Sequence, residues 1–115
     1  MKYLDTINLP DHPDCSVWIG AYAHDAHGQA PCVRVTDSSK ESLLTLSVNL
    51  PGVDLAPGEI AIKTWSENEP YIKAMLDCGL FEDTGHRVPT GFARAHIWRL
   101  SEVALERLTT IVPIH

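Results

Sequence analysis

A chain of 115 residues, 44% of them hydrophobic and 21% charged, has the size and composition of one globular domain. Such a chain buries enough apolar surface to fold without a metal or a disulfide. The formal net charge is −6, and the nine Lys and Arg residues are scattered along the chain. Because binding to DNA or RNA needs a basic face that neutralises phosphates, we expect one domain over residues 1–115 without direct nucleic-acid contact.

The cysteines and the N-terminal segment indicate the cellular compartment of the protein. Cys15, Cys32 and Cys78 are an odd number and show no CxxC spacing, which is typical of reduced thiols rather than of a secreted disulfide framework. The first residues lack the apolar run of a signal peptide, and no apolar stretch approaches the roughly 18 residues of a membrane helix. The sequence therefore predicts a cytoplasmic protein that does not contact a membrane.

The first two thirds of the chain predict an antiparallel meander of short strands. Apolar and polar residues alternate most regularly where Leu44, Leu46 and Val48 are interleaved with polar side chains, the pattern of a half-buried strand. Turn-forming residues separate this segment from its neighbours, and Pro51-Gly52 and Pro57-Gly58 bracket a tight connection. Strands are expected at residues 2–9, 16–23, 33–36, 44–49 and 60–62.

The apolar period changes to that of a helix after residue 65. Ser66-Glu67-Asn68-Glu69 matches a capping box, in which the serine hydroxyl and the second glutamate satisfy free amides of the first turn. Ile72, Met75 and Leu76 form one apolar stripe, and Gly79 is a natural left-handed stop. These signals predict a helix over about residues 67–78.

The last part of the chain returns to strands. Residues 80–88 and 91–99 are expected to pair around Pro89-Thr90-Gly91, and Ser101 to cap a short helix over 102–108. The inner face of that helix is assigned to Val103 and Leu108, with Ala104 or Leu105. The predicted fold is therefore α+β, an antiparallel sheet of about five to seven short strands with one main helix packed on it and a short C-terminal helix.

No recognisable enzyme or cofactor motif is present. The chain contains no nucleophile elbow GxSxG, no P-loop and no GxGxxG, and its cysteines fit structural patterns better than a Cys–His pair with His86 or His96. His24, Asp25 and His27 form the most suggestive metal-binding cluster. A tetrahedral site needs a further ligand, which the sequence does not single out, so a solvated polar turn is the favoured interpretation. We expect a non-enzymatic protein without a cofactor.

Acidic residues near the main helix are candidates for binding a partner. Glu67 and Glu69 precede the helix, Asp77 ends it, and Glu82 and Asp83 follow, so that together they define a candidate negative patch. Such a patch would imitate the charge of nucleic acid towards a nucleic-acid-handling protein, although an acidic surface also simply favours solubility. Trp65 is a further candidate, as an aromatic side chain at an interface. Arg87 is a candidate anion ligand in the segment 84–92, although a plain hairpin loop is the favoured interpretation of that segment.

A set of motifs between about residues 43 and 100 supports a family resemblance. They are Leu44–Leu50 (LTLSVNL), Leu55–Glu59 (LAPGE), Ala61–Glu69 (AIKTWSENE) and Thr84–Phe92 (TGHRVPTGF). In these motifs the chain resembles the small proteins catalogued as domain of unknown function 4313, over about half of its length. The family's PTGR-like turn reads Asp83-Thr84-Gly85-His86-Arg87 here, which departs from that pattern at two places.

The resemblance implies a genomic setting and no catalytic residues. The family is similar to accessory proteins of plasmids, integrative elements and phages, and small acidic proteins of such elements often antagonise host defence by binding CRISPR or restriction complexes. The leading hypothesis is a protein-binding module of a mobile element that inhibits such a complex. The alternatives are an accessory protein of conjugation or replication, and a small metal-binding protein or enzyme that uses His24, Asp25 and His27.

Overall fold

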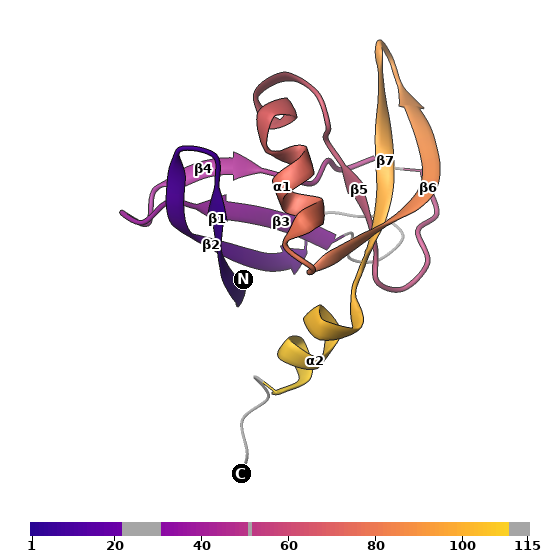
Figure 1. Ribbon diagram of the computed structural model, residues 1–115. Coiled ribbons are helices and arrows are strands. Elements are labelled where there is room, and N and C mark those ends of the chain that lie inside the picture. The colour runs from indigo at the N-terminus through magenta and orange to yellow at the C-terminus, as the bar shows by residue number, and fades with distance from the viewer. Residues whose placement is uncertain (22–30, 51, 111–115) are drawn as a thin grey trace.

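The computed structural model describes residues 1–21, 31–50 and 52–110, and it confirms the α+β class (Figure 1). His24, Asp25 and His27 lie outside the described residues, as does the turn expected there. The elements in chain order are β1 (Lys2–Leu9), β2 (His12–Ala21), β3 (Pro31–Thr36), β4 (Ser42–Thr45), β5 (Glu59–Ile62), the 3₁₀ helix η1 (Ser66–Tyr71), α1 (Ile72–Asp77), β6 (Phe81–Thr90), β7 (Ala93–Leu100) and α2 (Glu102–Thr110).

The expected sheet is present as two antiparallel sheets that are joined by one short segment. The first has the order β1-β2-β3-β4 and the second has the order β5-β7-β6. Directly after β4, Leu46 donates its amide to the Val33 carbonyl, and its own carbonyl accepts the amide of Lys63. Ser47 forms an isolated bridge with Ile62. The strand predicted over 44–49 therefore links the two sheets instead of ending in the first.

The main helix has the predicted position and a different start. Its first half is the 3₁₀ helix η1, and only Ile72–Asp77 is α-helical. The capping box is wrong: Ser66 has a left-handed φ of 59°, and the N-cap position of η1 belongs to Trp65, which makes no side-chain cap hydrogen bond. Gly79 has a φ of 84° and ends the helix as predicted.

A buried amide explains why the helix starts in this way. Asn68 is fully buried, and its Nδ2 donates to the carbonyls of Thr45 (2.8 Å) and Lys63 (2.9 Å). Thr45 is the last residue of β4, and Lys63 directly follows β5, so the two carbonyls belong to separate sheets. Because unpaired buried carbonyls are costly, the position of Asn68 is fixed by the sheets rather than by a local cap.

The core lies between the sheets and the helical segment. Strands of both sheets supply fully buried apolar side chains, and α1 adds Met75, which is completely inaccessible. Trp98 of β7 is also fully buried and stacks obliquely on Phe81 with a ring-centroid distance of 6.0 Å. Since α1 contacts both β1 and β6, the helix closes the space between the two sheets (Figure 1). No helix among the described residues is long and apolar enough to cross a membrane.

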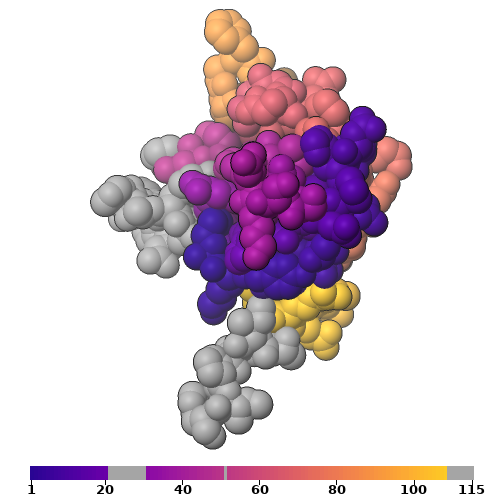
Figure 2. All heavy atoms as spheres, turned by 90° about the vertical axis from the view of Figure 1, so that its left-hand side faces the viewer, coloured from indigo at the N-terminus to yellow at the C-terminus, as the bar shows by residue number. Residues whose placement is uncertain are grey.

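The hairpin formed by β6 and β7 extends past the rest of the molecule. β5 pairs with β7 only as far as Ile62 opposite His96, whereas β6 and β7 continue to pair as far as Thr90 opposite Ala93. The distal half of the hairpin is therefore a two-stranded ribbon, which projects at the top of the molecule in two perpendicular views (Figures 1 and 2).

The C-terminal helix α2 is capped as predicted and packs differently. The Ser101 hydroxyl accepts the amide of Ala104 (3.2 Å) and donates to the Gly79 carbonyl (2.6 Å). Ala104 is fully buried and Leu108 packs on the core, as expected. Val103, expected on the inner face, is instead 48% exposed, because Ala104 and Leu108, four residues apart, form the face that packs on the core.

Candidate functional site

The strongest binding feature of the described surface is the tip of the β6–β7 hairpin. Thr90 pairs with Ala93, so the turn itself consists of Gly91 and Phe92. Gly91 has a φ of 72°, which this tight turn requires at its first position and which glycine adopts without strain. The turn holds the Phe92 ring away from the protein, with a relative exposure of 112%. The sequence predicted a turn here and gave no sign that an aromatic side chain would be left uncovered.

The hairpin tip also differs in charge from the rest of the chain. Residues 84–94 hold two of the nine Lys and Arg residues, Arg87 and Arg94, and none of the fifteen Asp and Glu residues. Arg94 is exposed two positions after Phe92, and among the described residues it has no ion-pair partner. The tip therefore combines an exposed aromatic ring with an available cation, on a protein whose net charge is negative.

A bulge at the base of the hairpin holds Arg87 close to the strand. The pairing of β6 with β7 shifts between Asp83 and Arg87, and Gly85 within the bulge has a φ of 88°. Both terminal nitrogens of Arg87 donate to the two carboxylate oxygens of Asp83 at 2.9 Å. The Thr84 hydroxyl donates to the carbonyl of Ile97 on β7 (2.6 Å), which ties the bulge to the neighbouring strand.

Three ionisable groups at this bulge have shifted pKa values. The hydrogen bonds from Arg87 lower the pKa of Asp83, and the same carboxylate raises the pKa of Arg87. His96 pairs with Arg87 across the hairpin, and its Nδ1 is buried without a hydrogen-bond partner. Burial, followed by the nearby Arg87 charge, lowers the pKa of His96. Since Arg87 is engaged by Asp83, it is not a free anion ligand.

The five acidic candidates do not behave as one free negative patch. Four of them are paired with a nearby basic side chain. The pairs are Glu67 with Lys63 (2.7 Å), Asp77 with Lys73 (2.8 Å), Glu82 with Arg99 (2.8 Å) and Asp83 with Arg87 (2.9 Å). Glu69 is exposed on η1 and makes no ion pair within the described part of the chain. These local pairs reduce the negative potential that a basic partner would meet.

Of the three tryptophans, Trp18 and Trp65 are half-buried. The Nε1–H of Trp18 donates to the Thr36 hydroxyl (2.9 Å), and its ring meets that of Tyr3 edge to face. Trp18 therefore stabilises the packing of β1, β2 and β3 in the first sheet. Trp65 occupies the extended position directly before η1 and keeps part of its surface accessible. Trp65 remains a candidate contact, although Phe92 offers far more accessible aromatic surface.

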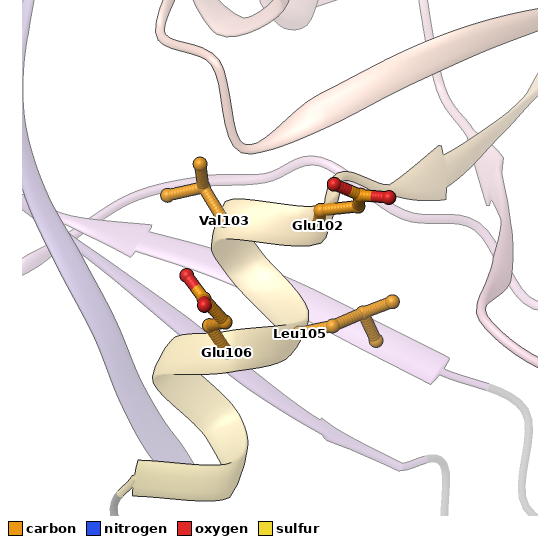
Figure 3. A pocket seen from close by; sticks show the side chains of 4 residues that line it. All are labelled: Glu102, Val103, Leu105 and Glu106. Carbon is orange, nitrogen blue, oxygen red and sulfur yellow. The ribbon is translucent and has the colours of Figure 1, made fainter.

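A shallow hollow on α2 provides a second surface with an apolar character. It has a volume of about 440 Å³ and is lined by Glu102, Val103, Leu105 and Glu106. Figure 3 shows Glu102 and Leu105 on one side of the helix and Val103 and Glu106 on the other, so each apolar side chain has a carboxylate as its neighbour. Val103 and Leu105 are 48% and 47% exposed. The sequence indicated an amphipathic helix but did not show which apolar residues would stay outside the core.

The thiols and possible metal ligands offer little chemistry in the described residues. Burial raises the pKa of the Cys15 and Cys78 thiols, which keeps both protonated and weakly nucleophilic at neutral pH. Across residues 1–21, 31–50 and 52–110, no group of three His, Cys, Asp or Glu side chains is placed to hold a metal ion.

Comparison of the chain with family models, with curated proteins and with solved structures finds no match.

Proposed function

We propose that this protein is a non-enzymatic module that binds another protein through the tip of its β6–β7 hairpin. The observation that carries the proposal is the complete exposure of Phe92 at the end of a projecting ribbon. Exposing a phenylalanine to water forgoes about 1.5–3 kcal/mol of burial free energy. A turn that holds this ring outward is therefore best explained by burial in a partner, where aromatic anchors carry most of the binding energy.

The base of the hairpin supports such a role. An anchor binds more tightly when it is held in its bound position beforehand, because less conformational entropy is lost on association. The Asp83–Arg87 pair and the bond from Thr84 to Ile97 restrain the ribbon at the point where it leaves the three-stranded sheet. The ribbon therefore presents Phe92 in a defined direction.

The experiment that tests this function is comparative affinity purification from a bacterial host extract. Wild-type protein and Phe92→Ser are compared, with Phe92→Tyr as the variant that keeps an aromatic ring and Arg34→Ala as an exposed control on β3. We expect one or more host proteins to be retained by the wild type, by Phe92→Tyr and by Arg34→Ala. Phe92→Ser should lose them. A retained set that is identical for all four proteins would contradict the proposal.

We further propose that the partner belongs to a host defence complex that acts on nucleic acid. This step depends on the net charge of −6 and on the resemblance to proteins of mobile elements. The local ion pairs favour recognition by the hairpin over charge mimicry, because most of the candidate acids are partly neutralised. Expression in hosts with active CRISPR or restriction systems is expected to raise phage plating, and Phe92→Ser to abolish that effect. Unchanged plating with the wild type across such hosts would refute the assignment.

A further inference from the structure

The outer edge of β7 is open along the distal half of the hairpin ribbon (Figure 1). We propose that the partner docks an extended segment of its own backbone on this edge, beside Phe92 and in line with β5. The inference rests on the proposed function, because it states how the partner held at Phe92 is recognised. In such strand addition, main-chain hydrogen bonds supply affinity and the neighbouring side chains supply specificity.

The backbone of Arg94 points toward the open edge. Successive residues of a strand direct their N–H and C=O groups alternately to its two sides. The Leu100 amide donates to the Gly58 carbonyl on the β5 side (3.1 Å), whereas the Ile97 carbonyl faces β6, where it accepts the Thr84 hydroxyl (2.6 Å). Since Arg94 precedes Leu100 by an even number of residues, its N–H and C=O groups point to the β5 side.

The strand β5 does not reach Arg94. The last pair between β5 and β7 joins Ile62 to His96. The chain then turns away from β7, because the amide of Lys63 donates to the Leu46 carbonyl (2.8 Å). No backbone group in the described part of the chain bonds the N–H or C=O of Arg94. One donor and one acceptor are therefore presented side by side, which is the pattern that a single residue of an antiparallel strand satisfies.

The opposite edge of the same ribbon is closed to an added strand. Pro89 lies across from Arg94 on β6, and its nitrogen has no hydrogen to donate. The bulge between Asp83 and Arg87 interrupts the regular spacing of that edge. Prolines and bulges are the devices by which proteins protect exposed edges from pairing. The distal half of β7, all of which the structure describes, carries neither device, so β7 is the edge that stays available.

The side chains along this edge define the segment that fits it. Phe92 is fully exposed at the tip, and Arg94 is exposed without an ion-pair partner among the described residues. In an antiparallel pair the directly opposite side chains lie on the same face, where opposite charges attract. We therefore expect an extended segment with an acidic residue opposite Arg94, next to an apolar cavity of the partner that takes the Phe92 ring.

The test separates the backbone of Arg94 from its side chain. The probe is the host protein that wild-type bait retains from extract and that Phe92→Ser loses, measured over a range of bait concentrations. Arg94→Ala keeps the N–H and should weaken retention by about twofold to fivefold, through the lost charge contact alone. Arg94→Pro also removes the N–H and leaves a carbonyl of the partner unpaired, so it should weaken retention by about a further tenfold.

A second measurement keeps the test independent of the proline substitution. Arg94 and Pro89 form a pair without mutual backbone bonds, so Arg94→Pro breaks no bond of the hairpin, and circular dichroism should show it folded. In the wild type, adding the recovered host protein should slow hydrogen exchange at the Arg94 amide by about tenfold or more. Equal retention by Arg94→Ala and Arg94→Pro, or unchanged exchange at this amide, would overturn the strand addition. The proposed function then still stands, because Phe92→Ser loses the protein.

Two further outcomes count against the proposal. If no retained host protein depends on Phe92, the proposed function and the strand addition fail together. If the purified wild type sediments as a dimer that Arg94→Pro dissolves, the edge pairs with a second copy of the chain and not with a partner protein.

Discussion

Asp83 and Arg87 face each other across the bulge of β6, and both carboxylate oxygens of Asp83 lie 2.9 Å from the terminal nitrogens of Arg87. Planar two-point pairing of this kind adds directional constraint to the attraction between the charges. The pair lies at the base of the ribbon that carries Phe92, so the attraction between these two charges helps to fix the direction in which the hairpin points.

Breaking this pair is expected to cost little stability and to loosen the hairpin. Asp83→Asn should lower the free energy of unfolding by about 1 kcal/mol or less, because the pair is partly solvated. Native-state hydrogen exchange should show faster exchange for the amides of residues 86–88 and 90–94. Asp77→Asn, which removes the highly exposed pair with Lys73, is the matched control and should leave that exchange unchanged. Equal exchange in Asp83→Asn and wild type would show that the pair does not restrain the ribbon.

Replacing Ser66 by glycine is expected to stabilise the protein. Ser66 is exposed with a φ of 59°, a conformation that costs a non-glycine residue about 1–2 kcal/mol. Glycine relieves this strain but loses more backbone entropy on folding, so the net gain should be about 0.5 kcal/mol in urea denaturation. A capping box would require a loss instead, of roughly a few tenths of a kcal/mol with Ser66→Gly and about 1 kcal/mol with Glu69→Ala. Glu69→Ala should instead stay within about 0.5 kcal/mol of the wild type.

Truncation of Asn68 is expected to be strongly destabilising. Asn68→Ala removes the donor for the carbonyls of Thr45 and Lys63, leaving both without this bond in a partly buried place. The free energy of unfolding should fall by about 2–4 kcal/mol. Glu67→Ala, one residue earlier and exposed, serves as the control in the same denaturant titration. A loss below about 1 kcal/mol would mean that the link between β4, β5 and η1 does not depend on this amide.

Stability should decline below neutral pH because of His96. The pKa of His96 in the folded protein lies below its ordinary value of 6.5, so the unfolded chain takes up the proton first as the pH falls. The contribution is fully present above about pH 6.5 and is lost as the pH falls towards the lowered pKa. His96→Gln should flatten the free energy of unfolding measured between pH 7 and pH 5. His86→Gln, on the exposed part of the bulge, should keep the wild-type slope, and the same slope in all three proteins would contradict this account.

Local signals predicted the elements well because each one acts within a few residues. Gly79 ends its helix with a positive φ, whereas the alternation around Leu44 predicted a strand over 44–49 that overlaps only the end of β4 (Ser42–Thr45). The capping box failed because Asn68 is held by carbonyls from two distant segments, a contact that no local pattern encodes. Likewise, which face of α2 packs on the core, the face of Ala104 rather than that of Val103, depends on tertiary contacts and not on the local pattern.

The site was less predictable than the fold for the same reason. Acidic residues are visible in a sequence, but their pairing with Lys63, Lys73, Arg87 and Arg99 depends on how the elements meet. Phe92 was expected in the strand 91–99 and instead occupies the turn, where it is exposed because β5 ends at Ile62 and does not cover the distal hairpin. The resemblance to domain of unknown function 4313 and the role against host defence remain predictions.

The central claim, that the hairpin tip binds protein, is tested most directly by photo-crosslinking in living cells. A benzophenone amino acid replaces Phe92 in one variant and Arg34 in the other, so that one exposed side chain of each region is sampled. We predict a crosslinked protein species from position 92 that is absent from position 34, with a host protein as the captured molecule. Capture of nucleic acid or lipid at position 92, or the same protein species from both positions, would contradict the claim.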